Sequence, residues 1–430
     1  VVRTIAVGDP VNDAASLRAT TSISDEQVSR VKAIMDEVAV KGDRSLIDYT
    51  QTFDGVKLDS LIVTGTEIEK AYSAVSRPQL RALKEMKARL ERAEKTVIGR
   101  LSKKKIGLRF GGVKITKLLR PVASAGCYIP GGRARYPSTM IMCAVPARVA
   151  GVKRIAACTP PRKDGSVDPL TLVAADLCGV SEIYRVGGAQ SIAAMAYGTE
   201  SIQPVSKIVG PGGTFVTVAK FLASSRVSID MLAGPTELLV IADERADPRS
   251  VALDLISQAE HSTDTFCGVV TWSKKFAERF ASDLSDALDG MEERTEIVRS
   301  SLEQNGFMAL CRNYGDAVRF ANELAPEHLQ VIARDARKIG AKIESAGLIL
   351  LGDYATSAAS DYGFGSNHVL PTLGFAKSRA SLSCLDFVKM VSVVESSREG
   401  LRKVAGTVKE LSEAEDLPNH YRAVMERLKR

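Results

Sequence analysis

The chain has 430 residues, more than one compact core usually contains, so its length indicates two or three structural units. Hydrophobic residues make up 45% of the chain and charged residues 25%, which is typical of a globular enzyme and excludes fibrous and disordered classes. The net charge is +7, but the basic residues are scattered, and the densest run, residues 102–105, contains no aromatic residue. This distribution argues against nucleic-acid binding.

The cysteines and the hydropathy pattern bear on location. Seven cysteines are spread along the chain without a C-x-x-C pair, which predicts free thiols in a reducing compartment. No run of 18 apolar residues occurs, and residues 1–13 lack the charged-then-apolar pattern of a secretory signal. We therefore expect a cytoplasmic protein that is neither secreted nor inserted in a membrane.

The first part of the chain is predicted to be helical. Residues 1–24 are expected to form an N-terminal extension, and apolar residues recur at helical spacing over residues 25–98. Ser24, followed by acidic residues, is a typical helix start, and a second helix is expected after Pro78. Residues 83–101 mix apolar residues with Lys, Arg and Glu, which indicates an amphipathic helix with one solvated face.

Short β-branched runs alternate with alanine-rich helical stretches from Val122 onwards. This alternation predicts a parallel sheet with right-handed crossovers and helices on its faces. We expect residues 121–234 to form one Rossmann-like unit that binds the cofactor. Its predicted strands are Arg154–Cys158, Glu182–Val186, Lys207–Val209 and Ser228–Leu232, and its predicted helices are Leu170–Leu177, Ala189–Tyr197 and Phe215–Ser224.

A second alternation predicts another α/β unit, formed by residues 235–375 together with residues 25–120. Residues 376–430 are expected to form a charged, helical C-terminal segment. The expected fold is therefore α/β, with two incomplete, doubly wound Rossmann-like domains and helical N- and C-terminal appendages. The predicted strands of the second unit are Glu237–Ala242, Cys267–Trp272, Phe307–Leu310, Leu329–Ile332 and Leu348–Leu351.

Glycines gather where predicted strands meet predicted helices, in the turns Pro130–Gly132, Gly187–Gln190 and Gly210–Gly213. Such turns allow backbone amides and a helix N-terminus to approach a phosphate, which makes a dinucleotide plausible. The G-x-G-x-x-G fingerprint is absent, however, and glycine in such a turn often serves only to provide a positive φ angle. Tyr128, just before the first turn, could stack on a cofactor or simply pack.

Only four histidines occur, all after residue 260. Gln258 and His261 are spaced i, i+3 at the end of a predicted helix and therefore share one face. Asp361 and His420 could add a carboxylate and a second imidazole, a ligand set that suits zinc, manganese or cobalt. The absence of thiolates favours an open, exchangeable metal site, although a histidine without any metal is the commoner case.

Glu327 and His328 are adjacent titratable residues that follow Pro326, whose fixed φ angle stiffens the approach to a predicted strand. Adjacent Glu and His side chains can divide two proton transfers between them. A capping Glu beside a packed His fits the sequence equally well. Cys127, near the first glycine turn, is a weaker candidate as a nucleophile, because its apolar context is typical of a buried thiol.

Five sequence motifs connect these features. They closely resemble the motifs of the histidinol dehydrogenase family, occur in the same order, and extend the resemblance over nearly the whole chain. The motifs are Cys127–Arg133 (CYIPGGR), Asp230–Leu238 (DMLAGPTEL), Gln258–His261 (QAEH), Ala325–Leu329 (APEHL) and Ser360–His368 (SDYGFGSNH).

The resemblance implies a homodimeric, zinc-dependent enzyme of histidine biosynthesis that uses NAD to oxidise histidinol twice, through histidinal to histidine. Zinc in this family holds the imidazole and amino group of the substrate, so its main role is orientation. The family's zinc ligands match Gln258, His261, Asp361 and His420, the last of these from the partner subunit. Its catalytic pair matches Glu327 and His328, its further substrate contacts match Thr236 and Glu415, and its NAD contacts match Tyr128, Gln190 and Gly213.

Two positions depart from the family pattern. Gly213 stands where Asn commonly contacts NAD, so one side-chain hydrogen bond is lost, whereas Thr236 replaces a usual Ser and keeps the hydroxyl. Three alternatives stay open: a paralogous dehydrogenase of another small diol such as dihydroxypropanesulfonate, a metal-dependent hydrolase in which Glu327 activates water, and a non-catalytic metal-binding protein. Glu415 and His420 favour histidinol, because these positions line the histidinol pocket in the family.

Overall fold

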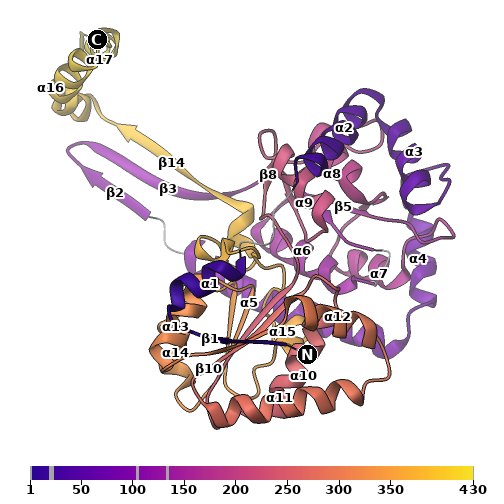
Figure 1. The fold of residues 1–430 in the computed structure, drawn as a ribbon. Coiled ribbons are helices and arrows are strands. Elements are labelled where there is room, and N and C mark those ends of the chain that lie inside the picture. Colours follow the sequence, from indigo (N-terminus) through magenta and orange to yellow (C-terminus); the bar gives the residue numbers. More distant parts are fainter. Residues whose placement is uncertain (1, 19–23, 103–105, 132–134, 430) are drawn as a thin grey trace.

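A computed structural model describes residues 2–18, 24–102, 106–131 and 135–429. It contains two α/β units and an arm that projects away from both (Figure 1). Within the described ranges, no helix is both long enough and apolar enough to span a membrane. Gly132 of the first predicted glycine turn and residues 103–105 of the basic run lie outside the described residues.

A five-stranded parallel sheet forms the first unit, with the strand order β6-β5-β4-β7-β8. This order places a topological switch point between β4 and β7, where ligands bind in open α/β sheets. The strands are β4 (Ser124–Tyr128), β5 (Arg154–Thr159), β6 (Glu182–Arg185), β7 (Lys207–Val209) and β8 (Ser228–Ile229), and the helices between them are α6 (Pro137–Ala150), α7 (Pro169–Leu177), α8 (Gly188–Tyr197) and α9 (Thr214–Ala223). The predicted strands are confirmed, except that the one predicted over Ser228–Leu232 is limited to Ser228–Ile229. The central strand β4 was missed because its small residues carry little β-propensity.

A six-stranded parallel sheet forms the second unit, with the strand order β1-β11-β10-β9-β12-β13. Apart from β1, this order repeats that of the first unit. All five predicted strands are confirmed to within one residue. The strands are β1 (Arg3–Ala6), β9 (Glu237–Ala242), β10 (Phe266–Thr271), β11 (Phe307–Leu310), β12 (His328–Ile332) and β13 (Leu348–Leu351), and the helices are α10 (Pro248–Ala259), α11 (Lys274–Asp289), α12 (Thr295–Asn305), α13 (Tyr314–Leu324), α14 (Ala336–Gly340) and α15 (Ser357–Tyr362).

The N-terminal residues are more integrated than predicted. Strand β1 forms the edge of the six-stranded sheet beside β11, and α1 (Pro10–Arg18) packs against α13. Helices α2 (Asp25–Lys41), α3 (Asp43–Asp54), α4 (Gly65–Ser73) and α5 (Arg77–Ser102) pack on α6 to α9 of the first unit. The predicted grouping of residues 25–120 with the second unit is therefore wrong, because helical periodicity identifies an apolar face but not the sheet that it covers.

The arm is an antiparallel sheet of β2 (Ile106–Phe110), β3 (Val113–Pro121) and β14 (Val388–Ser396), with β3 in the middle. Two short 3₁₀ helices, Phe375–Lys377 and Cys384–Phe387, lead into β14. Helices α16 (Arg398–Ala414) and α17 (Pro418–Lys429) follow at the far end of the arm (Figure 1). The helical character of the C-terminal segment is confirmed for α16 and α17 but not for β14.

Candidate active site

Glu327 and His328 lie at the amino end of β12, beside the amino end of β9. Helix α13 ends at Ala325, which has a positive φ angle of 49°, and Pro326 then directs the chain into the strand. His328 is in register with Leu238 of β9. Both titratable side chains are buried, with 7% of Glu327 and 3% of His328 exposed.

The two side chains are held by the backbone of Glu237, the first residue of β9. The main-chain N–H of Glu237 donates to Oε2 of Glu327 over 2.7 Å, and Nδ1 of His328 lies 3.2 Å from the main-chain oxygen of Glu237. A carbonyl oxygen only accepts hydrogen bonds, so Nδ1 carries a proton. Nε2 of His328 has no hydrogen-bond partner among the described residues and lies 3.7 Å from Oδ1 of Asp361.

The surroundings of Glu327 and His328 raise the pKa of both side chains. Burial raises the pKa of Glu327, in spite of the opposing effect of the neighbouring imidazole. For His328, burial acts to lower the pKa, but the carboxylates of Glu327 and Asp361 outweigh it and raise the pKa to about 10. The cluster can therefore both accept and release protons, as acid–base chemistry requires.

Three of the predicted metal ligands converge beside this pair. Gln258 lies in the last turn of α10 and is 1% exposed. Its Nε2 donates to Oγ of Ser357 over 3.2 Å. Its buried Oε1 has no hydrogen-bond partner in the described part of the chain. Nδ1 of His261 lies 3.0 Å from the main-chain oxygen of Gln258, which leaves Nε2 of His261 for another ligand. Burial acts to raise the pKa of Asp361, but His328, His368 and His261 together lower it.

His368 is a functional candidate to which the sequence assigned no role. Its Nδ1 lies 3.1 Å from the main-chain oxygen of Asp361, and burial lowers its pKa. Its position as the last residue of the Ser360–His368 motif was the available signal. Thr236 lies directly before β9 and is half-buried, and its main-chain oxygen accepts the N–H of Phe266 over 2.9 Å.

Glu415 and His420 do not join this cluster within one chain. Glu415 caps the end of α16 and His420 lies on α17, both exposed at the end of the arm (Figure 1). Within the described residues, no group of three or more His, Cys, Asp or Glu side chains could hold a metal ion.

The predicted cofactor residues meet at the carboxyl edge of the five-stranded sheet. Tyr128 ends β4, and its hydroxyl lies 3.4 Å from the main-chain nitrogen of Gly188. Gly210, which follows β7, has a φ angle of +120°, and a Cβ there would lie 2.1 Å from the main-chain oxygen of Tyr128. Gly131 after β4 and the glycine turns after β6 and β7 thus lie around the switch point, where ligands bind in open α/β sheets.

Two helix N-termini at this edge have no side-chain cap. Gly187 precedes α8 and Gly213 precedes α9, and neither can cap the free N–H groups of its helix. Gln190 is 1% exposed, and its Oε1 has no partner in the described part of the molecule. Uncapped helix N-termini suit a phosphate, and an unpaired buried acceptor suits a hydrogen-bond donor of a ligand. Cys127, in contrast, is fully buried within β4, so its thiol is not accessible to a substrate as a nucleophile.

Comparisons with known proteins agree on one family. The family model described as histidinol dehydrogenase matches residues 17–428. The chain is 44% identical to histidinol dehydrogenase from Methanothermobacter thermautotrophicus, with 94% of each chain covered, and 42% identical to that from Archaeoglobus fulgidus, with 96% of this chain and 98% of the relative covered. The crystal structure of histidinol dehydrogenase from Elizabethkingia anophelis superposes with a TM-score of 0.93 at 34% identity, covering 100% of this chain and 98% of that one.

These matches bear on the alternatives that the sequence left open. Full-length similarity to enzymes named for histidinol oxidation favours an oxidoreductase of histidine biosynthesis over a diol dehydrogenase, a hydrolase or a passive metal-binding protein. It also explains why the fold contains two similar α/β units and a C-terminal arm. The chain belongs to the histidinol dehydrogenase family.

Proposed function

We propose that this chain oxidises histidinol to histidine in two successive NAD-linked steps through histidinal, on a zinc-bound substrate. The observation that carries the proposal is the buried pair Glu327–His328, with the unpaired Nε2 of His328 beside Asp361. Two successive oxidations need one base for the alcohol and one for the water that adds to the aldehyde. Two adjacent proton carriers match this requirement, whereas hydrolysis needs only one activated water.

Zinc would be held by Gln258, His261 and Asp361, together with His420 of the partner subunit. These side chains fit the ion, because Oε1 of Gln258 is buried without a partner in the described part of the chain and nitrogen and oxygen donors suit zinc. When bound, zinc would orient the imidazole and amino group of histidinol. Proton transfer would be carried out by the protein's own side chains, and NAD would accept the hydride.

The arm would bring Glu415 and His420 to the site of a second copy, so that the active unit is a homodimer with shared sites. A small sheet needs a covered hydrophobic face or a packed helix for its stability, and large exposed apolar side chains on a surface mark an interface. Burial in a symmetric dimer would cover them. The exposed apolar side chains of the arm include Leu108, Phe110, Met390, Val394 and Leu411.

NAD would bind at the carboxyl edge of the five-stranded sheet. Its pyrophosphate fits the uncapped helix N-termini at Gly187 and Gly213, and Tyr128 and Gln190 supply further contacts. Because Gly213 has no side chain, this position contributes only its backbone to cofactor binding. Hydride transfer then requires the nicotinamide to reach the substrate beside His328.

In the first step, Nε2 of His328 would take the hydroxyl proton of histidinol, and bound NAD would supply the acceptor for the hydride. The hydrogen bond from Nδ1 to the oxygen of Glu237 fixes the tautomer that leaves Nε2 as the acceptor. Engagement of Asp361 as a metal ligand would leave Glu327 as the main carboxylate acting on His328. A neutral imidazole is then easier to form, as a general base must be.

In the second step, Glu327 would take a proton from a water molecule that adds to histidinal, and NAD would again supply the acceptor for the hydride. Burial raises the pKa of Glu327 and so makes its carboxylate a stronger base. Oε2 is engaged by the N–H of Glu237, and no described residue donates to Oε1, which is left for the proton transfer. Histidinal stays in the site between the steps, away from competing reactions.

Substrate comparison tests this proposal. Purified protein with NAD and zinc should reduce NAD with histidinol and with histidinal, and not with dihydroxypropanesulfonate. If NAD were reduced with dihydroxypropanesulfonate and not with histidinol, the enzyme would be a paralogous diol dehydrogenase. Consumption of an ester or amide without NAD would indicate a hydrolase. All seven cysteines are free and buried, so we also place the enzyme in the reducing cytoplasm.

A further inference from the structure

Glu237 is a buried carboxylate that touches both proposed catalytic residues. Its N–H donates to Oε2 of Glu327, and in return its Oε2 accepts the N–H of Glu327 over 3.2 Å. Its main-chain oxygen lies 3.2 Å from Nδ1 of His328. One residue at the start of β9 therefore fixes the Glu327 carboxylate, the Glu327 backbone and the tautomer of His328.

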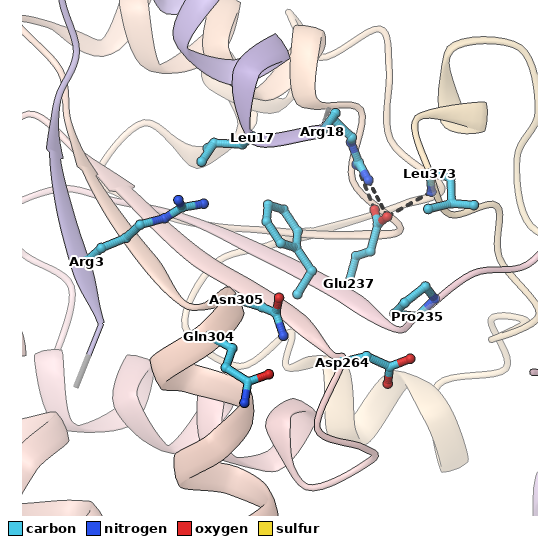
Figure 2. A pocket seen from close by; sticks show the side chains of 10 residues that line it. Arg3, Leu17, Arg18, Pro235, Glu237, Asp264, Gln304, Asn305 and Leu373 are labelled. Carbon is cyan, nitrogen blue, oxygen red and sulfur yellow. Dashed lines mark hydrogen bonds and ion pairs between the residues drawn. The ribbon is translucent and has the colours of Figure 1, made fainter. Parts of the chain in front are cut away.

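The side chain of Glu237 is held in turn by Arg18, the last residue of α1. Figure 2 shows the guanidinium of Arg18 directed at the Glu237 carboxylate, with the main chain of Leu373 beside it. Nη2 of Arg18 donates to Oε2 of Glu237 over 2.7 Å, Nη1 donates to Oε1, and the N–H of Leu373 donates to Oε1 over 2.8 Å. Both carboxylate oxygens are thus bound in a planar fork, a geometry that lysine cannot reproduce.

Arg18 also holds the turn that leads to the catalytic pair. Its Nε donates to the main-chain oxygen of Leu324 over 2.8 Å, and its Nη2 donates to that of Ala325 over 3.1 Å. Ala325 is the residue with the positive φ angle just before Pro326. The guanidinium therefore links the end of α13, the catalytic turn and the start of β9 in one network.

Stability alone does not account for such a network. The Glu237 side chain is 2% exposed, and a buried ion pair usually stabilises a protein no more than apolar side chains of similar size. A second buried carboxylate, that of Glu327, accepts a hydrogen bond from the Glu237 backbone. The two carboxylates therefore lie close enough to repel each other. What the pair provides is fixed geometry at the residues that transfer protons.

We propose that Glu237 is a positioning residue for both oxidation steps and that Arg18 holds it in place from the N-terminal helix. The inference rests on the proposed roles of Glu327 and His328. It predicts that loss of Arg18 slows turnover without weakening substrate binding, because the proposed metal and substrate ligands on α10 and α15 do not touch Arg18. A misplacement of about 1 Å at reacting groups can reduce a rate by about 100-fold.

The test is chemical rescue of Arg18→Ala by guanidinium. Arg18 is 19% exposed and lines a pocket of about 180 Å³, so a small cation can diffuse to the vacated position (Figure 2). We expect kcat to fall about 30- to 100-fold in Arg18→Ala, with KM for histidinol changed less than about threefold. Guanidinium chloride at millimolar concentration should restore turnover and saturate, whereas sodium chloride at equal ionic strength should not.

Arg154→Ala is the matched control. Arg154 is 22% exposed, forms a fork with Glu182 and donates to the main-chain oxygens of Gln203 and Pro204. It therefore resembles Arg18 in its own exposure and in its hydrogen bonds, although the side chain of Glu182 is 33% exposed, against 2% for Glu237. Loss of Arg154 should lower the melting temperature as much as the loss of Arg18 does but leave kcat unchanged, with or without guanidinium. Equal kcat losses in the two variants, or no guanidinium response in Arg18→Ala, would overturn the proposal.

Glu237→Gln provides a second variant that keeps size and shape. The amide retains one acceptor and should slow the histidinol and histidinal steps together, while binding zinc as tightly as the unaltered enzyme. Full turnover in Glu237→Gln would also overturn the proposal. Glu327→Gln and His328→Ala are measured in parallel. If those two variants remain active, the proposed catalytic roles fail; if they are inactive and the Glu237 and Arg18 variants are not, only the positioning role fails.

Discussion

The side-chain amide of Gln258 is tied to Ser357 across two helices, with Nε2 of Gln258 donating to Oγ of Ser357 over 3.2 Å. This bond decides which end of the amide is free. Oε1 stays unpaired in a buried position, in the orientation that a metal ligand needs. The main-chain N–H of Ser357 donates to Oε1 of Gln330 over 3.0 Å, so Ser357 is itself held by strand β12.

Ser357→Ala should therefore weaken zinc binding. Without the hydroxyl, the amide of Gln258 is free to rotate, and loss of such an outer contact typically lowers metal affinity about tenfold. Competition with a chelator measures the affinity, and kcat at saturating zinc should stay near the original value. Ser360→Ala is the control, because Oγ of Ser360 donates only to the main-chain oxygen of Ser357. An equal zinc affinity in Ser357→Ala would remove Gln258 from the ligand set.

His261→Ala and His328→Ala should separate metal binding from catalysis. His261→Ala should lose the metal, because an imidazole ligand disappears. His328→Ala should keep zinc and lose turnover by about 100-fold or more, because the base for the alcohol step is gone. Metal analysis after gel filtration and a rate assay provide the two readouts. Loss of zinc from His328→Ala would mean that the two roles are wrongly assigned.

Hybrid dimers test whether sites are shared. If His420 serves the partner's site, a dimer of one His261→Ala subunit and one His420→Ala subunit has one site with both changes and one intact site. Such a heterodimer, isolated through two different affinity tags, should show about half the original activity, although each variant homodimer is inactive. An inactive heterodimer would place His420 and His261 in the site of the same chain.

Much of the fold could be predicted because its strands are buried on both faces. Glu237–Ala242 is buried at every position, and such continuous apolar runs are characteristic of parallel sheets. The arm was missed for the opposite reason. Val388–Ser396 contains four valines and a methionine, and all of these except Val388 are exposed, so no surface within the described part of the same chain covers them. Strand propensity was present there, but hydrophobic periodicity favoured a helix.

The candidate site residues could be proposed from the sequence, but the contacts that hold them in place could not. Spacing placed Gln258 and His261 on one face, and the motifs added Asp361, which the structure brings beside His328. Glu237 lies in the Asp230–Leu238 motif, yet its pairing with Arg18 joins residues 219 positions apart. No local pattern encodes such a contact, because it depends on how α1 packs against α13.

Gly213→Asn should strengthen NAD binding. A Cβ at this position would meet nothing within 4 Å, and φ is −68°, so a side chain fits without strain. One added hydrogen bond from the Asn side chain to NAD should lower KM for NAD about three- to tenfold. Gly212→Asn is the contrasting control, because a Cβ there would lie 2.4 Å from Val216. An unchanged KM in Gly213→Asn would mean that NAD does not approach this helix end.

The most direct test of the central claim counts NADH per histidinol consumed, with zinc present and again after chelation. Two successive oxidations predict about two NADH for each histidinol, with histidine as the product and no free histidinal. Chelation should abolish the reaction, and added zinc should restore it. A ratio near one, or a rate that is indifferent to the chelator, would contradict the account.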